Sequence, residues 1–170
     1  MQPRRLALLS TGGTIEKTYD ARSGELQNRV SVLDVMLGSL ELRGVELDRV
    51  RLMNKDSLEM SEADHELIAR VAREEAARHD GVIVVHGTDR LAVTGERIAA
   101  AGPPAAPVVL TGAMRPYELR DSDALQNLTE ALMAAQLLPA GVYVVMHGQV
   151  LSFPGVVKDP ALGSFVKRSP

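Results

Sequence analysis

The sequence predicts an α/β fold in which a mostly parallel sheet lies between two layers of helices, as a single domain over residues 1–170. Three observations predict it. Short apolar runs alternate with longer amphipathic segments, the apolar runs end near glycines, and no Gly/Ser-rich or Pro-rich linker divides the 170 residues. Alternation of this kind is typical of βαβ units with right-handed crossovers. We therefore expect a three-layer α/β/α architecture.

The apolar runs predict buried strands because they are short and rich in leucine or β-branched residues. Four are clear, in chain order Leu6–Ser10, Val82–His86, Pro107–Thr111 and Val142–His147. A fifth run, Val45–Met53, is half polar and predicts a more exposed strand. Parallel strands bring their carboxyl ends to one edge of the sheet, so the residues after these runs should lie together.

The segments between the strands carry helix start and stop signals. Two Ser-x-x-Asp sequences resemble capping boxes: Ser61 with Asp64 before a helix to about Arg78, and Ser31 with Asp34 before a short helix through Leu37. Two more helices are predicted to stop at Pro- and Gly-containing segments, Leu91–Ala101 at Gly102-Pro103-Pro104 and Asp123–Leu138 at Pro139-Ala140-Gly141.

Composition excludes several classes of partner. Nineteen basic against twenty-two acidic residues leave a net charge of −3, with only five aromatic residues and no Trp, so nucleic acid is not an expected partner. The apolar run Leu6–Leu9 is too short for a signal peptide, and no stretch approaches the eighteen residues of a membrane span. We expect a cytoplasmic protein without a membrane partner.

Hydroxyl side chains stand beside glycines at three of the predicted strand ends. These segments are Ser10–Ile15, His86–Asp89 and Thr111–Pro116. Glycine allows a sharp turn and a close approach of substrate to the backbone, and a threonine hydroxyl becomes a nucleophile once a base removes its proton. The alternative is ordinary strand-to-helix turn chemistry, with Thr or Asp as an N-cap.

Other chemistries lack their sequence signatures. The chain has no nucleotide-binding glycine pattern, no serine-hydrolase elbow and no cysteine. The four histidines, His65, His79, His86 and His147, form no i, i+4 pair for a metal ion. No metal site and no cofactor are predicted.

The motifs together resemble the bacterial-type L-asparaginases, a family that includes glutaminase-asparaginases. Three ordered motifs carry the resemblance: Thr11-Gly12-Gly13-Thr14-Ile15, His86-Gly87-Thr88-Asp89 and Leu110-Thr111-Gly112-Ala113-Met114-Arg115-Pro116. Asn54–Met60 looks like the family's substrate-carboxylate loop, and the segment from Val150 to Lys158 resembles its catalytic-lysine segment. The resemblance covers only the family's N-terminal domain, so the chain looks like a short form without the C-terminal domain.

The resemblance implies hydrolysis of the side-chain amide of L-asparagine to L-aspartate and ammonia. Thr14 matches the threonine that forms the acyl-enzyme, and Tyr19 looks like the loop tyrosine that binds its hydroxyl; the alternative for Tyr19 is an exposed loop aromatic. Thr88, Asp89 and Lys158 look like a second constellation, which leaves open which threonine attacks first. A lysine in a partly desolvated pocket can accept a proton, and an aspartate beside it would oppose this, so Asp89 is expected on the substrate's α-ammonium instead.

The remaining site residues are assigned to substrate binding. The resemblance places Ser57 on the α-carboxylate, while Leu58 replaces the glutamine of periplasmic members and leaves the α-ammonium to Asp89 and Glu59. Backbone N–H groups near Gly13 and Thr88 are the expected oxyanion donors. The charged residues after the third motif, Arg115, Asp121 and Asp123, are expected to be structural, as a turn and a helix N-cap.

Two other functions stay open on sequence grounds. One is a non-catalytic amino-acid-binding or regulatory module, and the other is an amidohydrolase that prefers glutamine or a larger amide. We also expect a homodimer or a homotetramer, because closed symmetric assembly is the commonest outcome for soluble enzymes. Leu125, Leu128, Leu132 and Met133, at helical spacing, offer apolar surface for it, although the domain's own core could use most of them.

Overall fold

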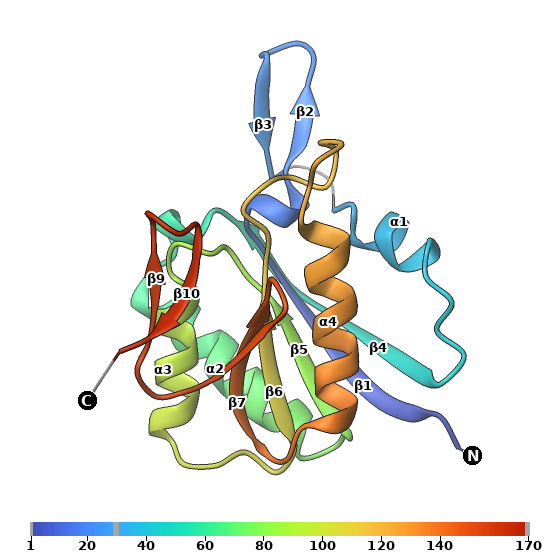
Figure 1. Cartoon of the computed structure of the whole chain (residues 1–170), viewed down its shortest axis with the longest axis vertical. Coiled ribbons are helices and arrows are strands. Elements are labelled where there is room, and N and C mark those ends of the chain that lie inside the picture. The colour runs from blue at the N-terminus through green and yellow to red at the C-terminus, as the bar shows by residue number, and fades with distance from the viewer. Residues whose placement is uncertain (1, 29–30, 169–170) are drawn as a thin grey trace.

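Six strands form the central sheet in the order β4-β1-β5-β6-β7-β8 (Figure 1). The computed structural model describes residues 2–28 and 31–168. The first five strands of this order are parallel, and β8 joins the edge antiparallel to β7. Their bounds are β1 Arg4–Gly12, β4 Val45–Lys55, β5 Gly81–Val85, β6 Pro107–Thr111, β7 Gly141–Met146 and β8 Gln149–Ser152. The mostly parallel sheet predicted from the sequence is confirmed.

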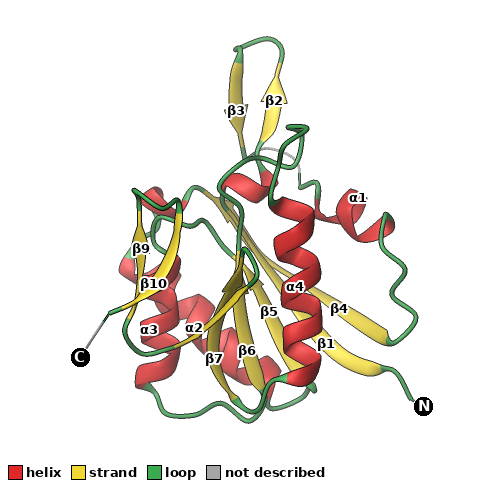
Figure 2. Ribbon diagram, in the orientation of Figure 1, coloured by secondary structure: helices red, strands yellow, loops and turns green. Residues whose placement is uncertain are grey.

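Helices cover both faces of this sheet (Figure 2). They are α1 Leu33–Gly38, α2 Glu62–Ala76, α3 Leu91–Ala100 and α4 Ala124–Leu137. Side chains on β1 alternate between the two resulting cores: Leu6 and Leu8 pack with α1 and α4, whereas Ala7 and Leu9 pack with α2 and α3. Because successive strand side chains point to opposite faces, one run of apolar residues supplies both cores. The three-layer α/β/α prediction is confirmed.

Several short elements were not predicted from the sequence. They are the hairpin of β2 Thr18–Asp20 with β3 Glu25–Gln27, strand β8, the ribbon of β9 Val156–Asp159 with β10 Ser164–Lys167, and the 3-10 turns Thr14–Glu16 and Ser57–Glu59. Each is three or four residues long. The sequence of so short a segment does not distinguish a strand from a loop, because a period-2 alternation needs more residues to be recognised.

The helix caps agree only in part with the predictions. Ser61 and Asp64 form the expected capping box at α2. The box expected at Ser31 is wrong, since Val32 is the N-cap of α1 and the Ser31 hydroxyl donates to Glu16 Oε1. Ser31 Oγ still accepts the Leu33 N–H over 3.3 Å, so it contacts the helix terminus from the position before the N-cap.

The N-terminus of α4 also lacks a side-chain capping bond. Asp123 is the N-cap residue, as expected, but its carboxylate makes no capping bond and instead accepts N–H bonds from Met114 and Arg115. On the helix itself, Leu128 and Leu132 belong to the core, while Met133 is exposed. Within residues 2–28 and 31–168, no helix is long and apolar enough to cross a membrane.

Candidate active site

The strand ends meet at one edge of the sheet, and glycines allow their close approach. A Cβ on Gly13 would lie 2.5 Å from the Gly87 Cα atom, and a Cβ on Gly87 would lie 2.6 Å from Ser57 Oγ. On the far side, a Cβ on Gly112 would lie 2.3 Å from the His86 carbonyl oxygen. Real Cβ atoms do not approach other atoms so closely, so any larger residue would push these segments apart.

The turn that carries Thr14 depends on two consecutive glycines with positive φ. Gly12 has φ 105° and Gly13 has φ 86°, values that residues with a Cβ rarely adopt. Thr14 then opens the 3-10 turn and is half-buried at the sheet edge. The Gly13 N–H donates to the Lys55 carbonyl over 2.9 Å, so it is not free for a substrate oxyanion as the sequence suggested. On this side of the site, the expected oxyanion donors are therefore the backbone N–H groups next to Gly13.

Lys158 lies against Thr88 and Asp89. Its Nζ atom is 2.9 Å from Thr88 Oγ1 and 2.6 Å from Asp89 Oδ1. The lysine comes from β9, which lies beside α3 (Figure 1). Thr88 is 4% exposed, whereas 46% of the Asp89 side chain faces solvent. The expectation that Asp89 stays away from the ammonium is wrong, because the ion pair forms directly.

The substrate-carboxylate loop brings only one of its three predicted residues to the strand ends. Ser57 is buried, and its Oγ accepts the Arg90 N–H over 3.3 Å. Leu58 is 62% exposed and Glu59 is also exposed, so neither lies against the threonines. Consecutive residues in a 3-10 turn point in different directions, which sequence spacing alone does not reveal.

Glu59 instead lines a polar pocket of about 380 Å³ beside the hairpin. The other residues around it are Lys17, Leu26, Gln27, Asn28, Asn54 and Asp56. Lys17 and Asp56 pair across it at 2.7 Å. The Asn28 side chain donates to the Gly13 carbonyl at 2.8 Å, which connects this pocket to the Thr14 turn.

Tyr19 lies on the hairpin of β2 and β3, which projects beyond the sheet edge (Figure 1). Its side chain is 60% exposed, and its backbone N–H donates to Glu118 Oε2 over 2.7 Å. No hydrogen bond joins its hydroxyl to Thr14 within the described residues. The structure therefore does not bring Tyr19 against the candidate nucleophile, and its assignment stays a prediction.

Two buried carboxylates at this edge were not assigned to the site from the sequence. Glu16 is 1% exposed and accepts the Gly12 N–H, and burial is the main cause that raises its pKa. Asp123, 6% exposed, accepts bonds from His147 Nε2 and from backbone N–H groups. The signal available for Glu16 was an acidic residue directly after the Thr11–Ile15 motif.

Two of the four histidines, His65 and His86, are buried. His86 is fully buried, and burial lowers its pKa to about 4. Thr94 Oγ1 lies 2.8 Å from His86 Nε2 and 2.7 Å from His65 Nδ1, so one hydroxyl joins the two rings. Among the residues that the structure describes, no group of three metal-ligating side chains occurs.

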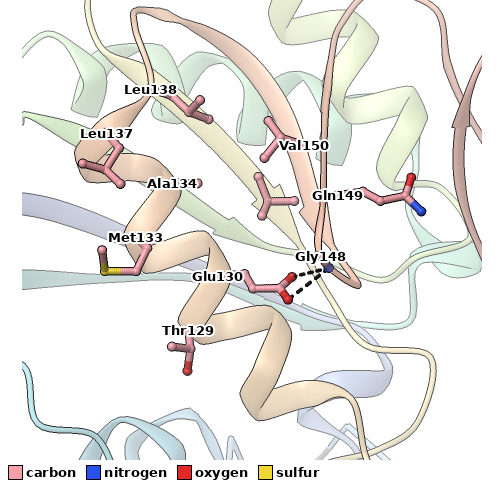
Figure 3. A pocket seen from close by; sticks show the side chains of 10 residues that line it. Thr129, Glu130, Met133, Ala134, Leu137, Leu138, Gly148, Gln149 and Val150 are labelled. Atoms are coloured by element: carbon pink, nitrogen blue, oxygen red, sulfur yellow. Dashed lines mark hydrogen bonds between the residues drawn. The ribbon is translucent and has the colours of Figure 1, made fainter.

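A separate apolar groove of about 400 Å³ lies between α4 and the β7–β8 hairpin (Figure 3). Met133, Leu137, Leu138 and Val150 line it, and at its end Glu130 accepts the Gly148 N–H. None of Thr14, Thr88, Asp89 or Lys158 contributes to it. The groove is therefore distinct from the cluster at the strand ends.

Comparison with known proteins identifies relatives of this arrangement. A family model described as asparaginase, N-terminal, matches residues 5–161. The chain is 36% identical over 157 residues to a subunit of the glutamyl-tRNA(Gln) amidotransferase of Aeropyrum pernix, covering 88% of this chain and 36% of that protein. It is 31% identical over 161 residues to an L-asparaginase of Thermococcus kodakarensis, covering 94% of this chain and 49% of that protein.

Solved structures that are similar to this chain include L-asparaginases. A thermostable L-asparaginase from Thermococcus kodakarensis superposes with a TM-score of 0.85 at 32% identity, over 96% of this chain and 51% of that one. A probable cytoplasmic L-asparaginase from Campylobacter jejuni superposes with a TM-score of 0.80 at 28% identity, with the same coverage. The chain thus spans between about a third and half of the length of these relatives.

Proposed function

Because the chain belongs to the asparaginase family through that family's N-terminal domain, we propose that it hydrolyses the side-chain amide of L-asparagine to L-aspartate and ammonia through a threonine acyl-enzyme. The observation that carries the proposal is the position of Lys158 Nζ, 2.9 Å from Thr88 Oγ1 at the same sheet edge as Thr14. An amide is a poor electrophile and a hydroxyl a poor nucleophile, so the reaction needs a base beside a threonine.

In this mechanism Thr14 Oγ attacks the amide carbon, and its proton passes through the Thr88 hydroxyl to Lys158 Nζ, which acts as the neutral amine in this step. The C–N bond then breaks, and the amide nitrogen takes up that proton from Lys158 and leaves as ammonia. Water attacks the resulting ester, releases aspartate and restores the Thr14 hydroxyl. The contact of Asp89 with Lys158 would hold the lysine nitrogen against Thr88, while N–H groups near Thr14 and Thr88 stabilise the oxyanion.

Substrate binding falls to Ser57 and Asp89 in this proposal. Ser57 lies against Gly87 and so is close to the Thr88 strand end, where it could bind the α-carboxylate. Asp89 keeps nearly half of its side chain exposed beside Lys158 and could also bind the α-ammonium. Leu58 cannot bond the ammonium, and Glu59 would reach it only if the 3-10 turn moved.

Tyr19 would join the site by a movement of the hairpin. The hairpin is only three residues long on each side and is attached at its base through the pair of Lys17 with Asp56. A pivot at that base would carry the ring toward Thr14. Closure would also exclude water and strengthen the polar contacts around the substrate.

A second candidate function is hydrolysis of glutamine, or of a larger amide, in support of amide transfer. It is favoured by the similarity to glutamyl-tRNA(Gln) amidotransferase subunits from several archaea, which covers 84% or more of this chain. One methylene separates asparagine from glutamine, a difference worth only about 1–3 kcal/mol in a pocket. The Thr14 and Lys158 chemistry would be the same for either amide.

Ammonia release from L-asparagine and L-glutamine, measured side by side with wild type and Thr14→Ala, tests both candidates. If wild type releases ammonia from asparagine and Thr14→Ala does not, the result supports the first function. Preferential release of ammonia from glutamine supports the second. If neither amide is hydrolysed while L-aspartate still binds, the chain is a non-catalytic amino-acid-binding or regulatory module.

We also propose a homodimer or homotetramer as the active form, since 46% of the Asp89 side chain stays exposed at the strand ends, on the edge from which the hairpin projects (Figure 1). A second copy would shield that edge from water. Light scattering and specific activity are measured across one dilution series. Activity should fall as the assembly dissociates, and a fully active monomer would contradict the assembly.

A further inference from the structure

The carboxylate of Glu16 folds back on the turn that contains Thr14. Its Oε2 atom accepts the Gly12 N–H over 3.0 Å, and its Oε1 atom accepts the Ser31 hydroxyl over 2.5 Å. The side chain is 1% exposed, which is unusual for a glutamate. Because Gly12 and Glu16 lie on either side of Thr14, this bond closes a ring around the candidate nucleophile.

The rest of the turn is held by backbone and amide groups. The Gly13 N–H donates to Lys55, and the Gly13 carbonyl accepts bonds from the Glu16 N–H at 3.2 Å and from Asn28 Nδ2 at 2.8 Å. Only the Gly12 N–H of this set depends on a charged side chain. Two consecutive residues with positive φ give the turn no intrinsic preference for this shape, so its hydrogen bonds must fix it.

Glu16 holds the turn rather than taking the proton of Thr14. Each of its oxygens already accepts a hydrogen bond from a donor other than the Thr14 hydroxyl. Burial raises the pKa of Glu16, and the Ser31 hydroxyl, the Gly12 amide and the charges of Arg49 and Arg51 oppose that rise. The donors around the carboxyl group are therefore arranged for an acceptor.

We propose that Glu16 is a positioning residue, whose buried carboxylate sets the Thr14 turn through the Gly12 N–H and ties it through Ser31 to the segment that follows the hairpin. The proposal rests on the proposed function in taking Thr14 as the reacting residue. It predicts that kcat depends on the length of the side chain that carries the acceptor oxygen, and not on its charge. Removing the acceptor would leave a buried N–H without a partner and free the turn to move.

Three substitutions of Glu16 separate the effect of side-chain length from the effect of charge. Glu16→Gln keeps an oxygen at the same distance, Glu16→Asp keeps the charge but is one methylene shorter, and Glu16→Ala removes both. We expect kcat of Glu16→Gln within about threefold of wild type, and losses of about tenfold or more in the other two, with smaller changes in KM. Glu46→Ala, an exposed glutamate on β4, is the matched control and should change neither constant.

Retained activity in Glu16→Asp together with lost activity in Glu16→Gln would overturn the proposal in favour of a charge effect. Unchanged activity in all three would also overturn it. The Gln and Asp variants keep a polar group at the position, so the comparison survives if Glu16→Ala does not fold.

Hydrogen exchange of the Gly12 amide gives a readout that does not require activity. The amide should be protected in wild type and Glu16→Gln, and should exchange at least about tenfold faster in Glu16→Asp. If wild type releases no ammonia from either amide, the proposed function fails while this measurement still decides the role of Glu16. Equal protection of Gly12 in wild type and Glu16→Asp would refute that role.

Discussion

Lys158 Nζ lies 2.9 Å from Thr88 Oγ1, although the two residues are 70 positions apart in the chain. The pair joins the ribbon of β9 and β10 to the loop after β5. A part-buried lysine nitrogen beside a buried hydroxyl is an arrangement suited to proton transfer. Lys158 therefore meets Thr88 only when β9 lies beside the loop that follows β5.

Lys158→Met should abolish turnover while leaving L-aspartate binding measurable. Methionine keeps most of the side-chain volume but cannot accept or donate the proton, whereas the contacts through Ser57 remain. Calorimetric titration with L-aspartate, beside the ammonia assay, measures the two effects. Loss of binding together with rate would make Lys158 a binding or structural residue.

Thr14→Ala and Thr88→Val should each lower kcat by about a hundredfold or more, because each removes a hydroxyl from the acyl-transfer constellation. Circular dichroism should show an unchanged fold. Thr129→Ala, an exposed threonine on α4, serves as the control and should keep wild-type kcat. A variant at either site that retains more than about a tenth of kcat would remove that residue from the mechanism.

The sequence predicted the sheet and the strand-end threonines because both follow from long, regular signals. The run Pro107–Thr111 is apolar up to its final threonine, and parallel pairing then brings such strand ends together. The direct contact of Asp89 with Lys158 was missed because it depends on the β9–β10 ribbon, whose strands are four residues long. The roles of Ser31 and Glu16 were missed because a local cap signal says nothing about a partner fifteen positions away.

Asp123→Asn should destabilise the fold by about 2–3 kcal/mol, because both carboxylate oxygens accept bonds from N–H donors. Oδ1 accepts from the Met114 and Arg115 amides, and Oδ2 accepts from Asn127 Nδ2 and His147 Nε2. In either orientation the asparagine NH₂ would face another donor. Urea unfolding of this variant, compared with exposed Asp121→Asn, measures the loss; equal stabilities would contradict the donor arrangement.

The buried His86 should make the fold less stable as the pH falls below about 6.5. Burial lowers its pKa from 6.5 to about 4, so the unfolded chain binds more protons than the folded one between these values. The stability that the neutral ring contributes is therefore complete above pH 6.5 and is lost as the pH falls toward 4. A shift of that size corresponds to about 3 kcal/mol at most.

A variant isolates this effect from the carboxylates, which also titrate in acid. His86→Asn keeps a donor for the Gly87 carbonyl, the partner of His86 Nδ1, but cannot gain a proton in this range. It should be less stable than wild type at pH 8, because the bond to Thr94 is lost. The gap between the two should narrow as the pH falls to 5, since only wild type loses the contribution of a neutral ring. Urea unfolding at pH 8, 6.5 and 5 measures that gap, and a gap that stays constant across the series would show that His86 does not set the acid sensitivity of the fold.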